Sequence, residues 1–218
     1  MAIKLFIEIK NLDMKKNLII IGASGHGKVV ADIAERLGHW NEIYFLDDDE
    51  SIKSLMEYKV IGTSKDITEY VNDSDFFVAI GKNETRMKIQ ELIEEVGGHI
   101  VSLVHPNAVI GKNVNIGVGT VVMAGAVINA ATNIGKGCII NTGATIDHDC
   151  QIGDYVHVSP GVNVAGTVKV GNLTWLGIGS KVSNNLTITN NCVIGAGAVV
   201  VKDIKKSGTY IGVPARRI

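Results

Sequence analysis

Hydrophobic residues recur every six positions through the second half of the chain. Sixteen consecutive positions at that spacing, from Ile110 to Val200, hold only Ile, Val or Leu. The position four residues after each of them holds a small or β-branched residue, with Leu186 as the exception. A short fixed period of this kind predicts one structural unit stacked on itself, as in a parallel β-helix.

Each six-residue unit is predicted to be a short strand followed by a corner. The aliphatic residue fills the interior, and the small residue fits beside it. Three units close one triangular coil of eighteen residues, and successive coils stack at the usual strand spacing of about 4.8 Å. Glycine often follows the aliphatic residue, as at Gly117 and Gly135. We expect these glycines to provide the positive φ of a tight corner.

The preceding residues follow a different pattern, in which strands of buried type alternate with helices. Strands are predicted at 17–21, 42–46, 58–62 and 76–80, and helices at 28–37, 66–72 and 84–96. This alternation predicts a small parallel sheet with helices on its faces, that is, a Rossmann-like α/β domain. The predicted division is an extension of unknown role at 1–13, the Rossmann-like domain at 14–104 and the β-helix at 105–218.

Composition and charge narrow the possible functions. The formal net charge is −1, from 21 basic and 22 acidic side chains, so no basic footprint for nucleic acid or an anionic membrane is expected. No apolar run is long enough for a transmembrane helix and no secretory signal is evident, which favours a cytoplasmic protein. All three cysteines (Cys138, Cys150 and Cys192) fall in the small inward position, which favours buried, reduced thiols. The Cys and His spacing matches no zinc pattern, and no metal is expected.

Candidate ligand-binding residues follow the predicted strands of the first domain. They are Ser24, Gly25 and His26 after the first strand, Asp47 and Asp48 after the second, and Gly81 after the third. Ligands of open parallel sheets bind beyond the carboxyl ends of the strands, and a glycine-rich turn before a helix favours an anion. The glycines are spaced G-x-x-G-x-G, unlike the dinucleotide fingerprint, so a mononucleotide-type ligand is the better prediction. A tight strand-to-helix connection without a ligand is the alternative.

Polar residues interrupt the repeat most clearly at Asp147-His148-Asp149, which we place at a corner. A histidine beside a carboxylate can be held in one tautomer with raised basicity, as a general base requires. An ordinary polar corner of a β-helix is the competing interpretation.

The chain resembles the sugar O/N-acetyltransferase family of hexapeptide-repeat acyltransferases, which includes bacillosamine-pathway N-acetyltransferases and sialic acid O-acetyltransferases. The residues that carry the resemblance are the turn 22–27, Leu46-Asp47-Asp48, Ala79-Ile80-Gly81-Lys82-Asn83 with Arg86, the run 147–150, the run 156–161, Ala165-Gly166 and the tail 212–216. The resemblance implies that the β-helix is left-handed. It also implies acetyl-CoA as co-substrate and a homotrimer with the active site between subunits.

The resemblance also implies roles for individual residues. His148 would be the general base and Asp149 the carboxylate that orients it, although many relatives carry Glu there. His157 and the Gly166 amide would contact the thioester end of acetyl-CoA, with the amide as an oxyanion donor. The rest of the CoA would contact Ile178, Ala196 and Arg216. The nucleotide portion of a nucleotide-sugar would contact Ser24, Gly25, His26, Asp47, Asp48 and Gly81.

The expected function is therefore N-acetylation of the 4-amino group of a UDP-linked 4-amino-6-deoxy sugar in bacterial glycan biosynthesis. An O-acetyltransferase acting on sialic acid or another polysaccharide precursor is the nearest alternative. A non-catalytic hexapeptide scaffold is less favoured, because it has no need of the His148–Asp149 pair. A nucleotide-dependent oxidoreductase is also less favoured, because the glycine spacing is wrong and the sheet is small.

Overall fold

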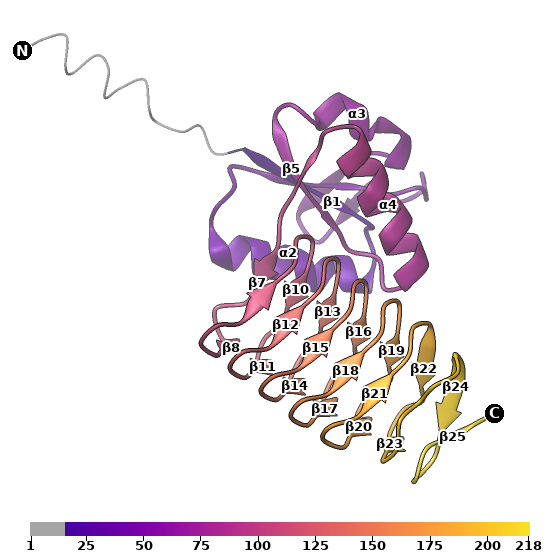
Figure 1. Cartoon of the computed structure of the whole chain (residues 1–218). Coiled ribbons are helices and arrows are strands. Elements are labelled where there is room, and N and C mark those ends of the chain that lie inside the picture. The colour runs from indigo at the N-terminus through magenta and orange to yellow at the C-terminus, as the bar shows by residue number, and fades with distance from the viewer. Residues whose placement is uncertain (1–15) are drawn as a thin grey trace, which may run out of the picture.

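The computed structural model describes residues 16–218, which form two domains packed against each other (Figure 1). The extension at 1–13 lies outside the described residues. No helix within residues 16–218 is both long enough and apolar enough to span a membrane.

The first domain is a six-stranded sheet with helices on both faces (Figure 1). Its elements are β1 (Asn17–Ile21), α2 (Gly25–Leu37), β2 (Ile43–Leu46), β3 (Ser54–Leu55), β4 (Tyr58–Gly62), the 3-10 helix η2 (Ser64–Asp66), α3 (Ile67–Tyr70), β5 (Ser74–Val78), α4 (Asn83–Glu95) and β6 (His99–Ile100). The strand order is β3-β4-β2-β1-β5-β6. Only the β3–β4 pair is antiparallel, so the predicted Rossmann-like parallel sheet is confirmed.

Several element boundaries differ from the predictions. Helix α2 begins at Gly25, three residues early, because glycine at position 27 allows its first turn to lie against the end of β1. A β-carbon on Gly27 would come within 2.3 Å of the Gly22 carbonyl oxygen. Strand β5 ends at Val78 rather than 80, and the Ile80 and Gly81 carbonyls turn toward Arg86 instead. The expected helix at 66–72 is divided into η2 and the short α3, and the hairpin strand β3 was not predicted.

The second domain is a triangular prism whose strands pair in parallel except for the last pair, which is antiparallel; it is the left-handed β-helix that the resemblance implied. Its first face contains β7 (Leu103–Val104), β10 (Val121–Val122), β13 (Ile139–Ile140), β16 (His157–Val158), β19 (Trp175–Leu176), β22 (Cys192–Ile194), β24 (Gly208–Ile211) and β25 (Arg216–Arg217). The second face contains β8 (Val109–Ile110), β11 (Val127–Ile128), β14 (Thr145–Ile146), β17 (Asn163–Val164), β20 (Lys181–Val182) and β23 (Val199–Val200). The third contains β9 (Asn115–Ile116), β12 (Asn133–Ile134), β15 (Gln151–Ile152), β18 (Lys169–Val170) and β21 (Thr187–Ile188).

The coil length agrees with the six-residue period. Val122 pairs with Ile140 and Ile128 with Ile146, which is eighteen residues per coil. The aliphatic positions of the repeat are buried except the first two, Ile110 and Ile116, which line the first coil where no coil lies beyond. The three cysteines are buried and unpaired, and burial raises the pKa of the Cys138 thiol to about 12.

The prediction about corner glycines was wrong. Glycines that directly follow the aliphatic residue, such as Gly117, do not have positive φ. They are needed because the next coil approaches closely: a β-carbon on Gly117 would lie 2.5 Å from the Gly135 carbonyl carbon. Positive φ occurs two residues later, at Gly119 and at corresponding corners that include Asp149 and Thr167. A non-glycine residue at such a corner adopts the left-handed region at some cost in strain.

The prism packs against the first domain through the outward side of its first face. Leu103, Val121 and Ile139 share one buried cluster with α2 residues such as Val30 and with Leu18 of β1. Helix α2 therefore lies between the sheet and the prism (Figure 1). The first prism strand begins at Leu103, two residues before the expected boundary, while β6 completes the sheet of the first domain.

Candidate active site

The corner that follows β14 holds His148 in a defined orientation. His148 Nδ1 lies 2.8 Å from Asp149 Oδ2, and the His148 backbone N–H donates to Asp147 Oδ1 at 2.8 Å. Asp147 Oδ1 also accepts from the Asn129 side chain, and the Asp147 carbonyl accepts from Thr132 Oγ1. An ionised carboxylate only accepts hydrogen bonds. The proton is therefore on Nδ1 of the neutral imidazole, which leaves Nε2 as the basic atom.

Gly166 lies beneath the His148 ring, one coil further along the same edge of the prism. A β-carbon on Gly166 would come within 2.7 Å of His148 Nε2 and 2.8 Å of Cε1. The next residue holds the two coils together at this corner, because the Thr167 N–H donates to the His148 carbonyl. Within residues 16–218 the Gly166 N–H has no hydrogen-bond acceptor. This corner therefore places a basic nitrogen close to a residue whose backbone N–H is free.

Charges around the corner favour the protonated form of His148. Its pKa is raised above the ordinary value, mainly by the hydrogen bond to Asp149 and then by the negative charge of Asp147. Both the His148 and the Asp149 side chains are well exposed, at 58% and 59%. The imidazole is therefore accessible and more basic than a free histidine, which suits proton abstraction.

His157 occupies a different environment, on the outward side of the first face. Its Nε2 lies 3.2 Å from Asn141 Nδ2, and its ring stacks on Trp175 with centroids 5.7 Å apart and parallel planes. Its Nδ1 is buried and has no partner in the described part of the chain. Burial lowers the pKa of His157 to about 3, and the charges of Arg86 and His26 add to this effect. His157 is thus a neutral hydrogen-bonding group.

His148 and His157 do not lie in one site of a single chain. They are nine residues apart, which is half a coil, so the first lies at the edge after β14 and the second on the opposite face in β16. The predicted CoA residues Ile178 and Ala196 are exposed and lie one coil apart along another edge, after β19 and β22. Arg216 is exposed in the C-terminal strand β25.

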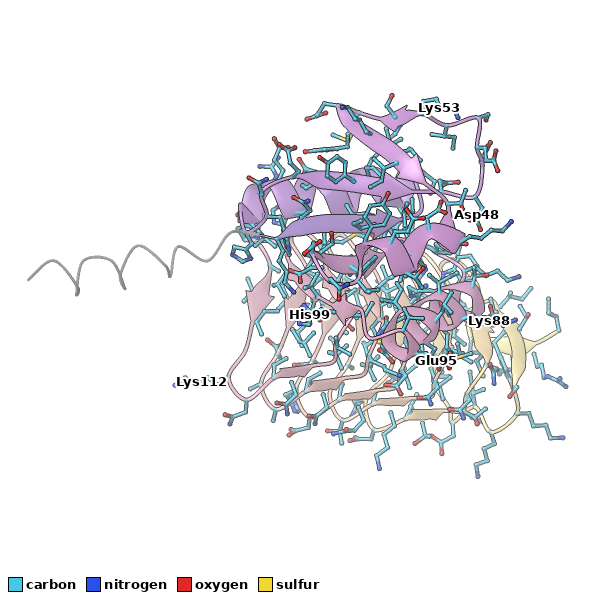
Figure 2. All side chains as sticks on the ribbon, turned by 90° about the horizontal axis from the view of Figure 1, so that it is seen from above. Asp48, Lys53, Lys88, Glu95, His99 and Lys112 are labelled. Atoms are coloured by element: carbon cyan, nitrogen blue, oxygen red, sulfur yellow. The ribbon has the colours of Figure 1, made fainter. Side chains whose placement is uncertain are left out.

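On the first domain, the two predicted aspartates lie at the carboxyl edge of the sheet. Asp47 Oδ2 accepts from the Ala23 N–H at 2.6 Å, and Asp48 Oδ1 accepts from the Ser64 N–H at 2.9 Å. Asp47 also borders a surface pocket of about 380 Å³. Figure 2 shows Asp48 at this edge and His99, the first residue of β6, at the other edge of the sheet. The aspartates therefore fix the loops of this edge to one another.

The glycine-rich turn leads directly into the first turn of α2. Ser24 is the N-cap residue, but its side chain makes no capping hydrogen bond, and both Ser24 and Gly25 are exposed. His26 is mostly buried and its Nε2 has no partner among residues 16–218. Burial, with a smaller contribution from the charge of Arg86, lowers the pKa of His26 to about 4.

Arg86 joins the two domains and was not assigned a role from the sequence. It is completely buried, and its guanidinium donates across the junction to the Gly137 and Tyr155 carbonyls at 2.7 and 3.1 Å. It also donates to the Ile80 and Gly81 carbonyls and to Asn83 Oδ1. Gly81 is thereby held against the prism. Arg86 stands in the quoted motif, but its long-range acceptors are backbone atoms, which leave no signal in a sequence.

A cavity of about 570 Å³ opens beside this junction. The loop Gly81–Glu84 forms one wall, and Leu173, Trp175, Val193 and His157 form the other. Asn141, which lies beside His157, was also not predicted from the sequence. Aligning the coils every eighteen residues would have placed Asn141 next to the strand that holds His157. No three His, Cys, Asp or Glu side chains gather as metal ligands anywhere in residues 16–218.

Comparison with protein families matches both domains separately. Residues 17–93 match the PglD N-terminal domain, and residues 131–166 match the bacterial transferase hexapeptide family with six repeats. Over 112 residues the chain is 37% identical to UDP-N-acetylbacillosamine N-acetyltransferase of Bacillus subtilis (strain 168). That alignment covers 50% of this chain and 52% of the relative, so it spans about half of the curated relative's length.

Solved structures match nearly the whole chain. The acetyltransferase domain of PglB from Neisseria gonorrhoeae FA1090, in complex with acetyl coenzyme A, is 39% identical with a TM-score of 0.91. The match covers 94% of this chain and 100% of that one. PerB from Caulobacter crescentus, in complex with CoA and GDP-perosamine, is 38% identical with a TM-score of 0.87, covering 92% of this chain and 96% of that one.

Proposed function

Because the chain belongs to the family of sugar acetyltransferases that join a PglD N-terminal domain to hexapeptide repeats, we propose that it N-acetylates a nucleotide-linked 4-amino-6-deoxy sugar with acetyl-CoA. A UDP-linked acceptor is the first candidate, and a GDP-linked one the second, because PerB is similar to this chain and was solved with GDP-perosamine. The observation that carries the proposal is the corner where His148, oriented by Asp149, lies over Gly166.

In this mechanism His148 is the general base. The amine nitrogen of the acceptor attacks the thioester carbonyl carbon, and His148 Nε2 takes the proton that the nitrogen loses. The Gly166 N–H, which is free to donate, stabilises the oxyanion that forms on the carbonyl oxygen. The carbon–sulfur bond then breaks, and the CoA thiolate takes up a proton from the His148 imidazolium, which returns to its neutral form. No covalent enzyme intermediate is required, and the buried cysteines are not suited to form one, since their pKa values are raised by burial.

The other site residues are proposed to bind the two substrates. His157 and the Gly166 amide contact the thioester end of acetyl-CoA, and the rest of CoA follows the exposed edge at Ile178 and Ala196 to Arg216. The nucleotide-sugar lies at the carboxyl edge of the first domain, where it contacts Ser24, Gly25, His26, Asp47, Asp48 and Gly81. Asp47 and Asp48 already accept backbone hydrogen bonds, so their share in ligand binding is partly to hold these loops in place.

We also propose that the active site forms between the subunits of a homotrimer. His148 and His157 face different sides of one prism, and only a second copy can bring them to the same acetyl group. This predicts complementation between inactive variants. Chains carrying His148→Ala and chains carrying His157→Ala, when co-expressed, should form mixed trimers with some intact sites and measurable activity. Activity no greater than that of either variant alone would place the site within one chain.

The reaction is tested by release of free CoA thiol from acetyl-CoA with UDP-, dTDP- and GDP-linked 4-amino sugars and with free sialic acid. Turnover of a nucleotide-linked amino sugar that is lost in His148→Ala supports the proposal. Turnover with sialic acid alone would favour the O-acetyltransferase alternative. Turnover that persists in a folded His148→Ala protein would overturn the role of the base.

A further inference from the structure

The outward side of the first face carries one row of residues that runs from the domain junction to an open surface. Paired one coil apart, its members are Leu103, Val121, Ile139, His157, Trp175 and Val193. The first three are buried under the first domain, whereas Trp175 is 48% and Val193 39% exposed. Beyond His157 the row continues as an apolar surface made of Trp175 and Val193, which the described residues leave partly uncovered.

This apolar surface is one wall of the 570 Å³ cavity. A volume of this size lies within the range of about 300–1,000 Å³ typical of small-molecule sites. The opposite wall, Gly81–Glu84, is the loop at the carboxyl end of β5, on the edge where we place the nucleotide-sugar. A sugar attached to a nucleotide at that edge reaches the prism through this cavity, beside His157.

Apart from His157, whose unpaired Nδ1 is buried, the side chains of the prism wall have no free hydrogen-bond donor. The indole N–H of Trp175 donates to Ser159 Oγ at 2.7 Å, and the ring stacks on His157. Trp175 therefore presents only apolar ring atoms to the cavity. The side chains beside it, Leu173 and Val193, are aliphatic. A hydroxyl placed against this wall would lose its water and gain no partner, whereas a methyl group would be well accommodated.

We propose that Trp175, Leu173 and Val193 form the subsite for C-6 of the acceptor hexose and select a methyl group there over a hydroxymethyl group. This inference rests on the proposed function, because it assigns part of the same acceptor site. An apolar pocket discriminates against an added hydroxyl by up to roughly a hundredfold in kcat/KM. We therefore expect a preference of about ten- to a hundredfold for the 6-deoxy sugar.

The test compares two pairs of acceptors with the whole chain. These are a UDP-linked 4-amino-4,6-dideoxyhexose and its 6-hydroxy counterpart, and the same pair linked to GDP. The ratio of kcat/KM values for one pair is the readout, since both members use the same base and the same acetyl-CoA. A change that only weakens catalysis or folding lowers both values and leaves the ratio unaltered.

Three variants test whether the side chains of this wall set the preference for the 6-deoxy sugar. Val193→Thr adds a hydroxyl to the wall at nearly constant volume and should reduce the preference about tenfold, since one hydrogen bond to the C-6 hydroxyl is worth roughly a factor of ten. Trp175→Phe keeps an apolar ring and should retain the preference. Val109→Thr makes the same change as Val193→Thr on an exposed residue of the second face, at the other end of the prism, and should not alter the ratio.

The ratios of kcat/KM in these proteins decide between the subsite and its absence. A wild-type preference that collapses in Val193→Thr but not in Val109→Thr supports the subsite. Equal use of the two sugars by the wild type, or a ratio that Val193→Thr leaves unchanged, overturns it while the proposed acetylation stands. If none of the UDP-, dTDP- or GDP-linked 4-amino sugars is acetylated, the proposed function is overturned, and the subsite with it.

Discussion

Gly166 lies one coil after His148, and a β-carbon on Gly166 would come within 2.7 Å of His148 Nε2. The basic nitrogen of the corner is therefore held directly over a residue that must lack a side chain. Gly166→Ala should displace the imidazole while keeping the backbone N–H. We expect kcat to fall about a hundredfold, the order associated with misplacing a catalytic group by roughly 1 Å.

The double variant distinguishes how this substitution acts. If Gly166→Ala acts only by moving the base, adding it to His148→Ala should lower kcat little further, because the two effects are coupled. A further loss as large as in the wild-type background would mean that the methyl group disturbs the thioester or the oxyanion donor instead. Steady-state kinetics of the four proteins measure this coupling.

Asp149 should control the pH dependence of the reaction. The base acts in its neutral form, so kcat/KM rises with pH through the pKa of His148, which Asp149 and Asp147 hold above its ordinary value. Asp149→Asn removes the main cause of that shift, and the acid limb of the profile should move to lower pH. The plateau at high pH should also fall, because the imidazole is a weaker and less well oriented base. An acid limb that stays in place would show that another group titrates.

The buried histidines should make the folded state sensitive to acid. Below pH of about 6.5 both imidazoles become protonated in the unfolded chain. In the folded protein, burial lowers the pKa of His26 to about 4 and that of His157 to about 3. The unfolded state therefore binds more protons, and the free energy of unfolding falls as pH decreases through this window.

Urea denaturation at pH 7 and pH 5 measures this effect. We expect a loss on the order of 1–3 kcal/mol from the two histidines together in the wild type. The double variant His26→Asn with His157→Gln should show a smaller loss, since neither replacement titrates. An equal loss in both proteins would assign the acid sensitivity to other groups. Replacing exposed His39 by Gln provides the control, because this side chain lies outside the junction.

Arg86 should contribute strongly to stability through the domain junction. Arg86→Met leaves four backbone carbonyls without this donor, the buried ones of Gly137 and Tyr155 and the partly buried ones of Ile80 and Gly81. We expect the free energy of unfolding to drop by about 2–4 kcal/mol. The polar groups left without partners lower the stability, and part of this loss is offset because the variant no longer buries a charge. Chemical denaturation measures this loss, and hydrogen exchange should show faster opening of the 80–83 loop. Arg36→Met, an exposed change on α2, should be close to neutral.

The sequence by itself was sufficient to predict the prism, its eighteen-residue coil and the alternating strands and helices before it. This was possible because a narrow interior accepts only aliphatic and small side chains, and that steric requirement repeats along the chain. The position of His148 at a corner beside a carboxylate also follows from local spacing. The same local view misjudged the glycines, since close approach of the next coil at Gly117, and not φ, excludes a side chain there.

Only the tertiary structure decided how the two domains and their side chains meet. Arg86 finds backbone acceptors in coils about 50 to 70 residues away, and backbone carbonyls have no identity in a sequence. His157 becomes a neutral, stacked group because of Trp175, Asn141 and the junction above it. Contacts of this kind depend on which surfaces are brought together by packing, whereas the repeat depends on each coil contacting its own neighbours.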